Sequence, residues 1–201
     1  MKKSISDKVY QQVRDSIITG EITNREIILE QVIANKFGIS KITARSILQR
    51  LCHEKYLTSY PRKGYLINEI TALQCKKIQQ LRYQIEAYAL RLIVSQGLKN
   101  ELVELEKLLE QSVENSKGPY QTINTRFHLL LAKLSGNEYI YDVLYPYLGY
   151  VARYAIASIE RGRFSPETNY HYNILHSLKN KDINTALNYL RLDLQLEKDE
   201  I

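Results

Sequence analysis

Apolar residues in the N-terminal part of the chain mark two amphipathic helices separated by a short linker. The first set recurs every four residues and predicts a helix over about residues 4–19: Ile5, Val9, Val13 and Ile17. Gly20 is placed to end this helix as a C-cap. A second apolar face predicts a helix over about residues 29–37: Leu29, Val32, Ile33 and Phe37. Gly38 ends it, so a tight turn follows.

A third helix is predicted over about residues 41–54, immediately after that turn. Ser40 is a good N-cap, and the face turned to the core is apolar: Ala44, Ile47, Leu48 and Leu51. Lys41, Thr43 and Arg45 then face away from the core. Helix, glycine turn and helix form the helix-turn-helix pattern.

Two short β-prone runs follow the third helix. They cover residues 56–60 and 64–67, and Pro61-Arg62-Lys63-Gly64 joins them as a turn. A basic hairpin after a helix-turn-helix is a wing.

From about residue 71 onward the chain shows only helical patterns, punctuated by glycine and proline. Helices are predicted at about 72–95, 99–116, 119–135, 137–161, 166–180 and 182–198. Short connections favour an antiparallel bundle, and Pro146 is expected to bend or split the fourth of these helices. The predicted fold is mainly α. A winged helix-turn-helix of three helices and a β-hairpin occupies residues 1–70, and an antiparallel all-α bundle of about six helices occupies residues 71–201.

Charge separates the two predicted domains. Residues 1–70 carry twelve Lys and Arg against seven acids, which accounts for +5 of the net charge of +6. A basic module next to a near-neutral one suggests a polyanion as the partner of the first. No apolar run is long enough for a membrane span, and no secretory signal follows the basic N-terminus. Cys52 and Cys75 are not in a metal or redox spacing, so we expect reduced thiols in a cytoplasmic protein.

The third helix and the wing supply side chains of the kind that contact DNA. A recognition helix needs an apolar back and an N-terminus aimed into the major groove, and Arg reads guanine with two hydrogen bonds. Base or phosphate contacts are expected from these residues: Gln31, Lys41, Thr43, Arg45, Gln49, Arg62, Lys63 and Gly64. Spacing alone is equally compatible with a small helical domain that has a solvated basic face.

Residues 5–68 resemble the DNA-binding domain of GntR-family regulators. The resemblance is carried by the opening helix through Thr19-Gly20-Glu21-Ile22, by Phe37-Gly38-Ile39-Ser40-Lys41, by Ala44-Arg45 and by the wing Pro61-Arg62-Lys63-Gly64-Tyr65. It implies that Lys41 and Arg45 are the principal DNA contacts, with Gly64 at the wing tip. The chain departs from the family pattern at Asn24-Arg25 (usually Pro-Gly), at Thr43-Ala44 (usually Pro-Val) and at Lys55 (often glycine). Because Thr43 is expected beside the bases, the operator sequence is expected to be unusual.

The C-terminal helices resemble the FCD effector domain of the FadR subgroup over about residues 72–196. Matching blocks include Leu81 to Glu86, Phe127-His128 and His171 to Ala186. The resemblance implies a divalent-metal site at four positions: Asn124, His128, His171 and Asp193. Asn stands where the family usually has Asp, and Asp where it usually has His. Two imidazoles and one carboxylate suit zinc or nickel, although buried or surface histidines without a metal are an equal alternative.

The same resemblance implies a small organic acid as effector and a homodimer that binds double-stranded operator DNA. A carboxylate in a helical cavity is best held by an arginine, and Arg82 and Arg153 are the preferred candidates over Arg126. Relief of repression by the effector is the expected mode, although the sequence leaves the sign of regulation open. The alternatives are a metal-dependent enzyme, which lacks an identifiable general base, and a helical interaction protein that does not bind DNA.

Overall fold

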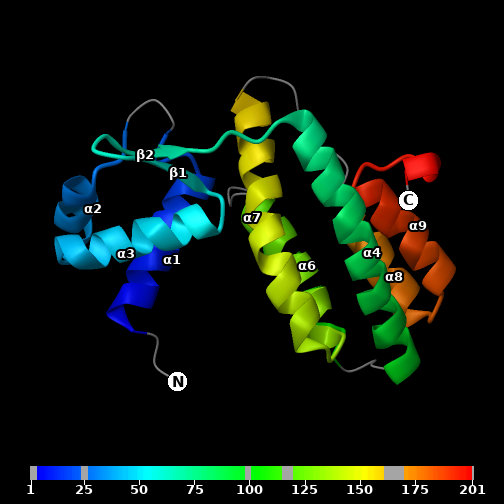
Figure 1. Cartoon of the computed structure of the whole chain (residues 1–201). Helices are drawn as coiled ribbons and strands as arrows, with labels where there is room; N and C mark the ends of the chain where they lie inside the picture. The colour runs from blue at the N-terminus through cyan, green and yellow to red at the C-terminus, as the bar shows by residue number, and fades with distance from the viewer. Residues whose placement is uncertain (1–3, 24–26, 98–100, 115–119, 161–169, 201) are drawn as a thin grey trace. The chain divides into compact units, whose positions relative to one another are not determined.

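The chain forms two compact units in a computed structural model, residues Met1–Ile70 and Thr71–Ile201. The structure describes residues 4–23, 27–97, 101–114, 120–160 and 170–200. Each unit has its own apolar core, and Figure 1 shows the helices and strands of both. The mainly helical architecture predicted from the sequence is confirmed.

The first unit is a winged helix-turn-helix. Its helices are α1 (Ile5–Ile18), α2 (Glu30–Phe37) and α3 (Lys41–His53), and its hairpin pairs β1 (Leu57–Tyr60) with β2 (Gly64–Ile67). Ser4 caps α1, and the stripe predicted for that helix supplies Val9, Val13 and Ile17 to the core, while Ile5 is exposed. Gly38 ends α2 in the left-handed conformation with φ of 63°, which a residue without Cβ adopts at no steric cost.

The second helix is shifted from its predicted face. It begins at Glu30, so that Leu29 becomes its N-cap, and both Leu29 and Val32 are exposed. Ile33 and Ala34 are the buried residues of α2 instead. Ile28 pairs with Tyr65 of β2, donating and accepting backbone hydrogen bonds of 2.8 and 3.0 Å, and this bridge holds the segment before α2 against the wing.

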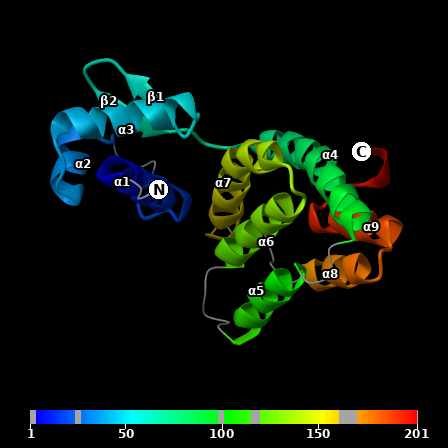
Figure 2. The ribbon, with the colours of Figure 1, turned by 90° about the horizontal axis from the view of Figure 1, so that it is seen from below.

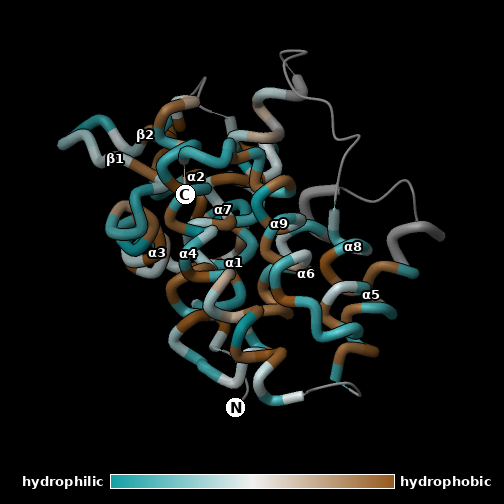
Figure 3. The backbone as a smooth tube through the Cα atoms, turned by 90° about the vertical axis from the view of Figure 1, so that its right-hand side faces the viewer, coloured by the Kyte–Doolittle hydropathy of each residue, from teal (hydrophilic) through white to brown (hydrophobic). Residues whose placement is uncertain are grey.

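The second unit contains six described α-helices. They are α4 (Ala72–Gln96), α5 (Val103–Glu114), α6 (Tyr120–Leu134), α7 (Glu138–Glu160), α8 (His171–Lys179) and α9 (Ile183–Asp193), followed by a 3-10 turn at Lys198–Glu200. The long helix α4 packs against α6, α7, α8 and α9, while α5 lies along α6 and α8, as Figure 2 shows. Hydrophobic and hydrophilic positions alternate along these helices in Figure 3, as amphipathic packing requires. The core includes Leu90, Ile93, Phe127, Leu131 and Leu190.

Pro146 was expected to bend or split its helix, and α7 continues through it without a split. The last helix ends earlier than the predicted residue 198. Helix α9 stops at Asp193 because Gln195 adopts φ of 56° and Leu196 donates its N–H back to the Arg191 carbonyl at 3.1 Å. This turn buries Leu194 and Leu196 in the core, and no glycine announces it in the sequence.

Candidate functional site

The start of α3 presents polar and charged side chains to solvent. The Ser40 hydroxyl accepts a hydrogen bond from the Thr43 N–H at 3.1 Å and thereby fixes the first turn of the helix. Lys41 and Gln49 are exposed, and the Arg45 side chain is 55% exposed. Thr43 is half-buried, with its hydroxyl 2.8 Å from the Ser40 oxygen. Apart from Thr43, the polar residues predicted on this helix therefore face outward.

A groove of about 410 Å³ lies between α3 and the wing. The residues at its edge include six of those predicted to contact DNA: Gln31, Lys41, Arg45, Arg62, Lys63 and Gly64. Thr43 and Gln49 are not among its lining residues. The fold thus brings residues of α2, α3 and the wing together in one cationic groove.

The wing tip is formed by Pro61 and Arg62 rather than by Gly64. Lys63 donates its N–H to the Tyr60 carbonyl at 3.0 Å, and Arg62 adopts φ of 64° at the third position of this turn. Gly64 begins β2 with φ of 125°, and a Cβ there would lie 2.6 Å from both the Ile28 carbonyl oxygen and Ile27 Cγ2. The glycine is therefore required by the packing of the wing on residues 27–28.

Arg45 is held by an acid from the preceding helix. Its Nε and Nη2 donate to the two carboxylate oxygens of Glu30 at 2.7 and 3.0 Å. The hydrogen bond to Arg45 lowers the pKa of Glu30 below its ordinary value, and the same bond raises the pKa of Arg45. Sequence reasoning missed Glu30, because an acid at the start of a helix is common on dipole grounds alone.

Ile42 was also missed. It follows Lys41 at the start of α3 and is 80% exposed, although isoleucine is normally buried. An apolar residue at the front of a recognition helix can contact the C5-methyl group of thymine. The signal available in the sequence was its position between two predicted DNA contacts on a helix whose apolar face lay elsewhere.

A second cluster lies inside the helical unit and joins α6, α8 and α9. His128, His171 and Asp193 each offer one ligand atom, and these atoms lie within 4.8 Å of one another. The two Nε2 atoms are buried without a well-directed hydrogen bond, at 3.2 Å (His128) and 3.5 Å (His171) from the Asp193 carboxylate. Phe127 stacks on the His171 ring at 4.1 Å and holds its plane.

Glu86 of α4 orients this cluster from behind. Its carboxylate lies 2.5 Å from His128 Nδ1 and accepts a hydrogen bond of 2.8 Å from Arg82 Nε. In the neutral ring that donates from Nδ1 to Glu86, Nε2 carries the lone pair on the side of His171 and Asp193, which is how a carboxylate prepares a histidine for a metal. All three side chains, of Arg82, Glu86 and His128, are buried.

The charges in this cluster compensate one another. Burial raises the pKa of Glu86 and of Asp193, but their cationic and hydrogen-bonding neighbours outweigh it and hold both carboxyls below their ordinary range. Burial lowers the pKa of His128, but the Glu86 carboxylate outweighs it and raises the pKa overall. For His171, burial prevails and the pKa is lowered. A neutral His171 and an ionised Asp193 are the protonation states that a metal ligand needs, whereas the raised pKa of His128 means that a metal must displace a proton from that ring.

The residues present fit a divalent metal. Two orphaned imidazole nitrogens and a carboxylate converge on one point, and the donor set is of the kind that zinc and nickel prefer. Asn124, the fourth residue of the predicted set, is half-buried on α6 one turn before His128. The structure thus brings three of the four predicted ligands together and places the fourth on the helix that carries His128.

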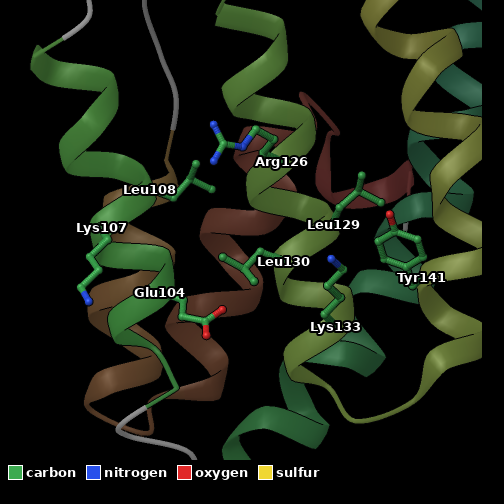
Figure 4. A pocket seen from close by; sticks show the side chains of 8 residues that line it. All are labelled: Glu104, Lys107, Leu108, Arg126, Leu129, Leu130, Lys133 and Tyr141. Atoms are coloured by element: carbon green, nitrogen blue, oxygen red, sulfur yellow. The ribbon is translucent and has the colours of Figure 1, made fainter. Parts of the chain in front are cut away.

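The arginines considered for an effector lie in different environments. Arg82 belongs to the buried cluster: its Nη1 donates to Gln79 at 2.7 Å, and its Nη2 is buried without a hydrogen bond among the described residues. Arg153 is half-buried on α7. Arg126 is exposed and lines an open groove of about 440 Å³ along α5, α6 and α7, together with Lys107 and Lys133 (Figure 4).

Family models match both units. Residues 5–67 match the model "Bacterial regulatory proteins, gntR family", and residues 77–195 match the FCD domain. None of the described helices combines the length and apolarity needed to cross a membrane.

Individual relatives and solved structures agree with these matches. The chain is 29% identical over 140 residues to the uncharacterized HTH-type transcriptional regulator YdhC of Bacillus subtilis, a match that spans 67% of this chain and 62% of that protein. It is 23% identical over 186 residues to the HTH-type transcriptional regulator McbR of Escherichia coli, covering 89% and 84% of the two chains. The solved structure of E. coli McbR/YncC superposes with a TM-score of 0.78 at 21% identity, over 96% of this chain and 95% of that one, which supports the fold.

Proposed function

Since this chain belongs to the GntR family of bacterial transcriptional regulators and carries a C-terminal FCD domain, we propose that it acts as a homodimer on a pseudo-palindromic operator. Two copies of α3 enter successive major grooves. A small organic acid bound in the helical unit changes the affinity for DNA and relieves repression. The family is one of regulators, which sets aside the metal-dependent enzyme.

The groove between α3 and the wing is the observation that carries this proposal. It presents four cations from two segments of chain, Lys41 and Arg45 from α3 and Arg62 and Lys63 from the wing. Phosphate contacts of this kind supply most non-specific affinity, whereas arginine and apolar side chains at the helix front read base edges. Gln31, which lines the same groove, and Gln49, which is exposed on α3, are further candidates for phosphate or base contacts.

Arg45→Ala tests the recognition helix, and Arg50→Ala is its matched control. The Arg50→Ala substitution removes the same charge from the same helix. Arg50, however, stacks over the Tyr10 ring of α1 at 3.7 Å and pairs with Glu54 at the end of α3. We expect Arg45→Ala to reduce affinity for the protein's own upstream region by about tenfold or more, as loss of a bidentate guanine contact implies. Equal affinities for Arg45→Ala and the parent would overturn the assignment of α3.

For the helical unit we propose that His128, His171 and Asp193 hold a divalent metal, with Asn124 or the effector as a further ligand. When bound, the metal supplies a Lewis-acidic site for a carboxylate. Arg82 donates to Glu86 and so supports the orientation of His128, and its Nη2 group is left to bind the effector carboxylate. Arg153 is the second candidate for binding that carboxylate.

Calorimetric titration of the chelator-treated protein with zinc and with nickel tests the metal site. We expect one ion per chain, with binding lost in His171→Ala and retained in His176→Ala, because His176 is an exposed histidine on the same helix. Binding that survives in His171→Ala would place the metal elsewhere. A thermal-shift panel of small carboxylates, run with and without the metal, tests the effector.

A further inference from the structure

Glu30 is an acid in a surface that otherwise suits DNA. Among the described residues that line the groove between α3 and the wing, it is the single carboxylate, and four cations line the same groove. A negative charge there opposes the phosphate backbone and lowers affinity for any duplex. Its presence therefore calls for a compensating role.

The contacts of Glu30 indicate what that role is. Its two oxygens receive the side edge of the Arg45 guanidinium, formed by Nε and Nη2, at 2.7 and 3.0 Å. Tyr65 of β2 donates its hydroxyl proton to the same carboxylate at 3.3 Å. Glu30 is thus fixed by α2, by α3 and by the wing, and only 16% of its side chain is exposed, whereas 55% of the Arg45 side chain is exposed.

An arginine held by its side edge keeps its end edge for another partner. The guanidinium is planar with five N–H donors, and the end edge, formed by Nη1 and Nη2, presents two parallel donors that match guanine O6 and N7. Restricting the guanidinium to one orientation lowers the entropy lost when it meets a base. Neutralising its charge also weakens its attraction to phosphates of any sequence.

We propose that Glu30 is a positioning residue for sequence recognition: it clamps Arg45 so that the guanidinium reads a base in the major groove instead of pairing with the nearest phosphate. The inference rests on the proposed DNA-binding role of α3. Glu30 lowers affinity for non-specific duplexes and raises the ratio of specific to non-specific binding.

The test compares affinities for a duplex enriched by the parent protein from a randomised pool with those for a scrambled duplex, over a range of salt concentrations. In Glu30→Gln, we expect the specificity ratio to fall about tenfold, through tighter binding to the scrambled duplex as much as weaker binding to the enriched one. The slope of log K against log salt for the scrambled duplex should steepen by about 0.9 per released arginine. Asp15→Asn is the matched control, because it removes one acid paired with Arg14 on α1, and its specificity ratio should equal the parent's.

Two further variants separate positioning from bulk charge and from folding. Glu30→Asp keeps the charge but not the reach, so it should lose specificity without the steeper salt slope. In an Arg45→Ala background, Glu30→Gln should leave the specificity ratio unchanged.

The proposal that Glu30 positions Arg45 is overturned if the specificity ratio of Glu30→Gln lies within twofold of the parent's, or if Glu30→Gln causes the same drop with and without Arg45. If Glu30→Gln lowers the thermal midpoint and leaves the specificity ratio unchanged, Glu30 only stabilises α2, and the proposal that it positions Arg45 is also overturned. Failure of the parent itself to prefer the enriched duplex would instead refute the proposed function.

Discussion

Substitution of the buried Glu86 by Gln should destabilise the helical unit more than substitution of an exposed charged residue. The side chains of Arg82, Glu86 and His128 are 1%, 0% and 0% exposed. The substitution keeps the size of the side chain but removes the charge that balances Arg82, which then remains buried without a counter-ion. Removing one partner of a buried pair costs about 3–5 kcal/mol, against a total stability of about 5–15 kcal/mol for a typical domain.

The matched control is Glu106→Gln. The Lys179 Nζ and Glu106 Oε1 atoms are 2.6 Å apart, closer than Arg82 and Glu86, but their side chains are 38% and 40% exposed. Solvent screens that pair, so its loss should cost less than about 1 kcal/mol. Distance alone would rank the two substitutions in the opposite order, and burial decides between them.

Urea denaturation of the chelator-treated protein, followed by far-ultraviolet circular dichroism, measures both variants. The double variant Arg82→Met/Glu86→Leu completes the experiment, because with both charges removed no lone ion remains, and we expect it to be more stable than Glu86→Gln. The reasoning would be refuted by a cost for Glu86→Gln no larger than that for Glu106→Gln, or by a double variant less stable than the single one.

Three further predictions concern the wing, the recognition helix and the buried cluster. Gly64→Ala should destabilise the first unit by about 2 kcal/mol or more, since its φ is strained for alanine and a Cβ there would lie 2.6 Å from the Ile28 carbonyl oxygen. Gly38→Ala, also at positive φ but with open space around it, should cost about 1 kcal/mol. Equal thermal shifts for the two variants would contradict the packing argument. If Ile42 contacts a thymine methyl, replacing that thymine by deoxyuridine should weaken binding by the parent about fourfold, the value of one buried methyl group. The affinity of Ile42→Ser should not change with this replacement. A thymine scan in which parent and variant respond alike would exclude the contact. Because the pKa of Asp193 is lowered in the folded state, the ionised carboxylate contributes fully to stability above the unfolded pKa of about 3.9, and this contribution is lost as the pH falls below that value. The thermal midpoint of metal-free Asp193→Asn should therefore fall less between pH 6 and 3 than that of the parent. Parallel pH curves for the two proteins would argue against this contribution.

The sequence alone determined the elements that local rules specify. A stripe of apolar residues at fours, a glycine before a serine cap and a basic turn between β-prone runs are local signals, and they were sufficient for the helix-turn-helix and its wing. The family resemblance likewise placed His128, His171 and Asp193 in one candidate site, and their side chains converge in the structure. The same periodicity placed Leu29 and Val32 in the core wrongly, because α2 begins one residue later and its orientation depends on what it packs against.

Only the tertiary structure decided how side chains from different elements compensate one another. No spacing rule links Glu30 to Arg45 or Glu86 to His128, since each pair joins separate helices and its energy depends on burial and geometry that the chain acquires on folding. The end of α9 at Asp193 is of the same kind: a left-handed glutamine is unfavourable locally and persists because it buries Leu194 and Leu196. Local patterns thus specified where the helices lie, while long-range packing set which charges meet.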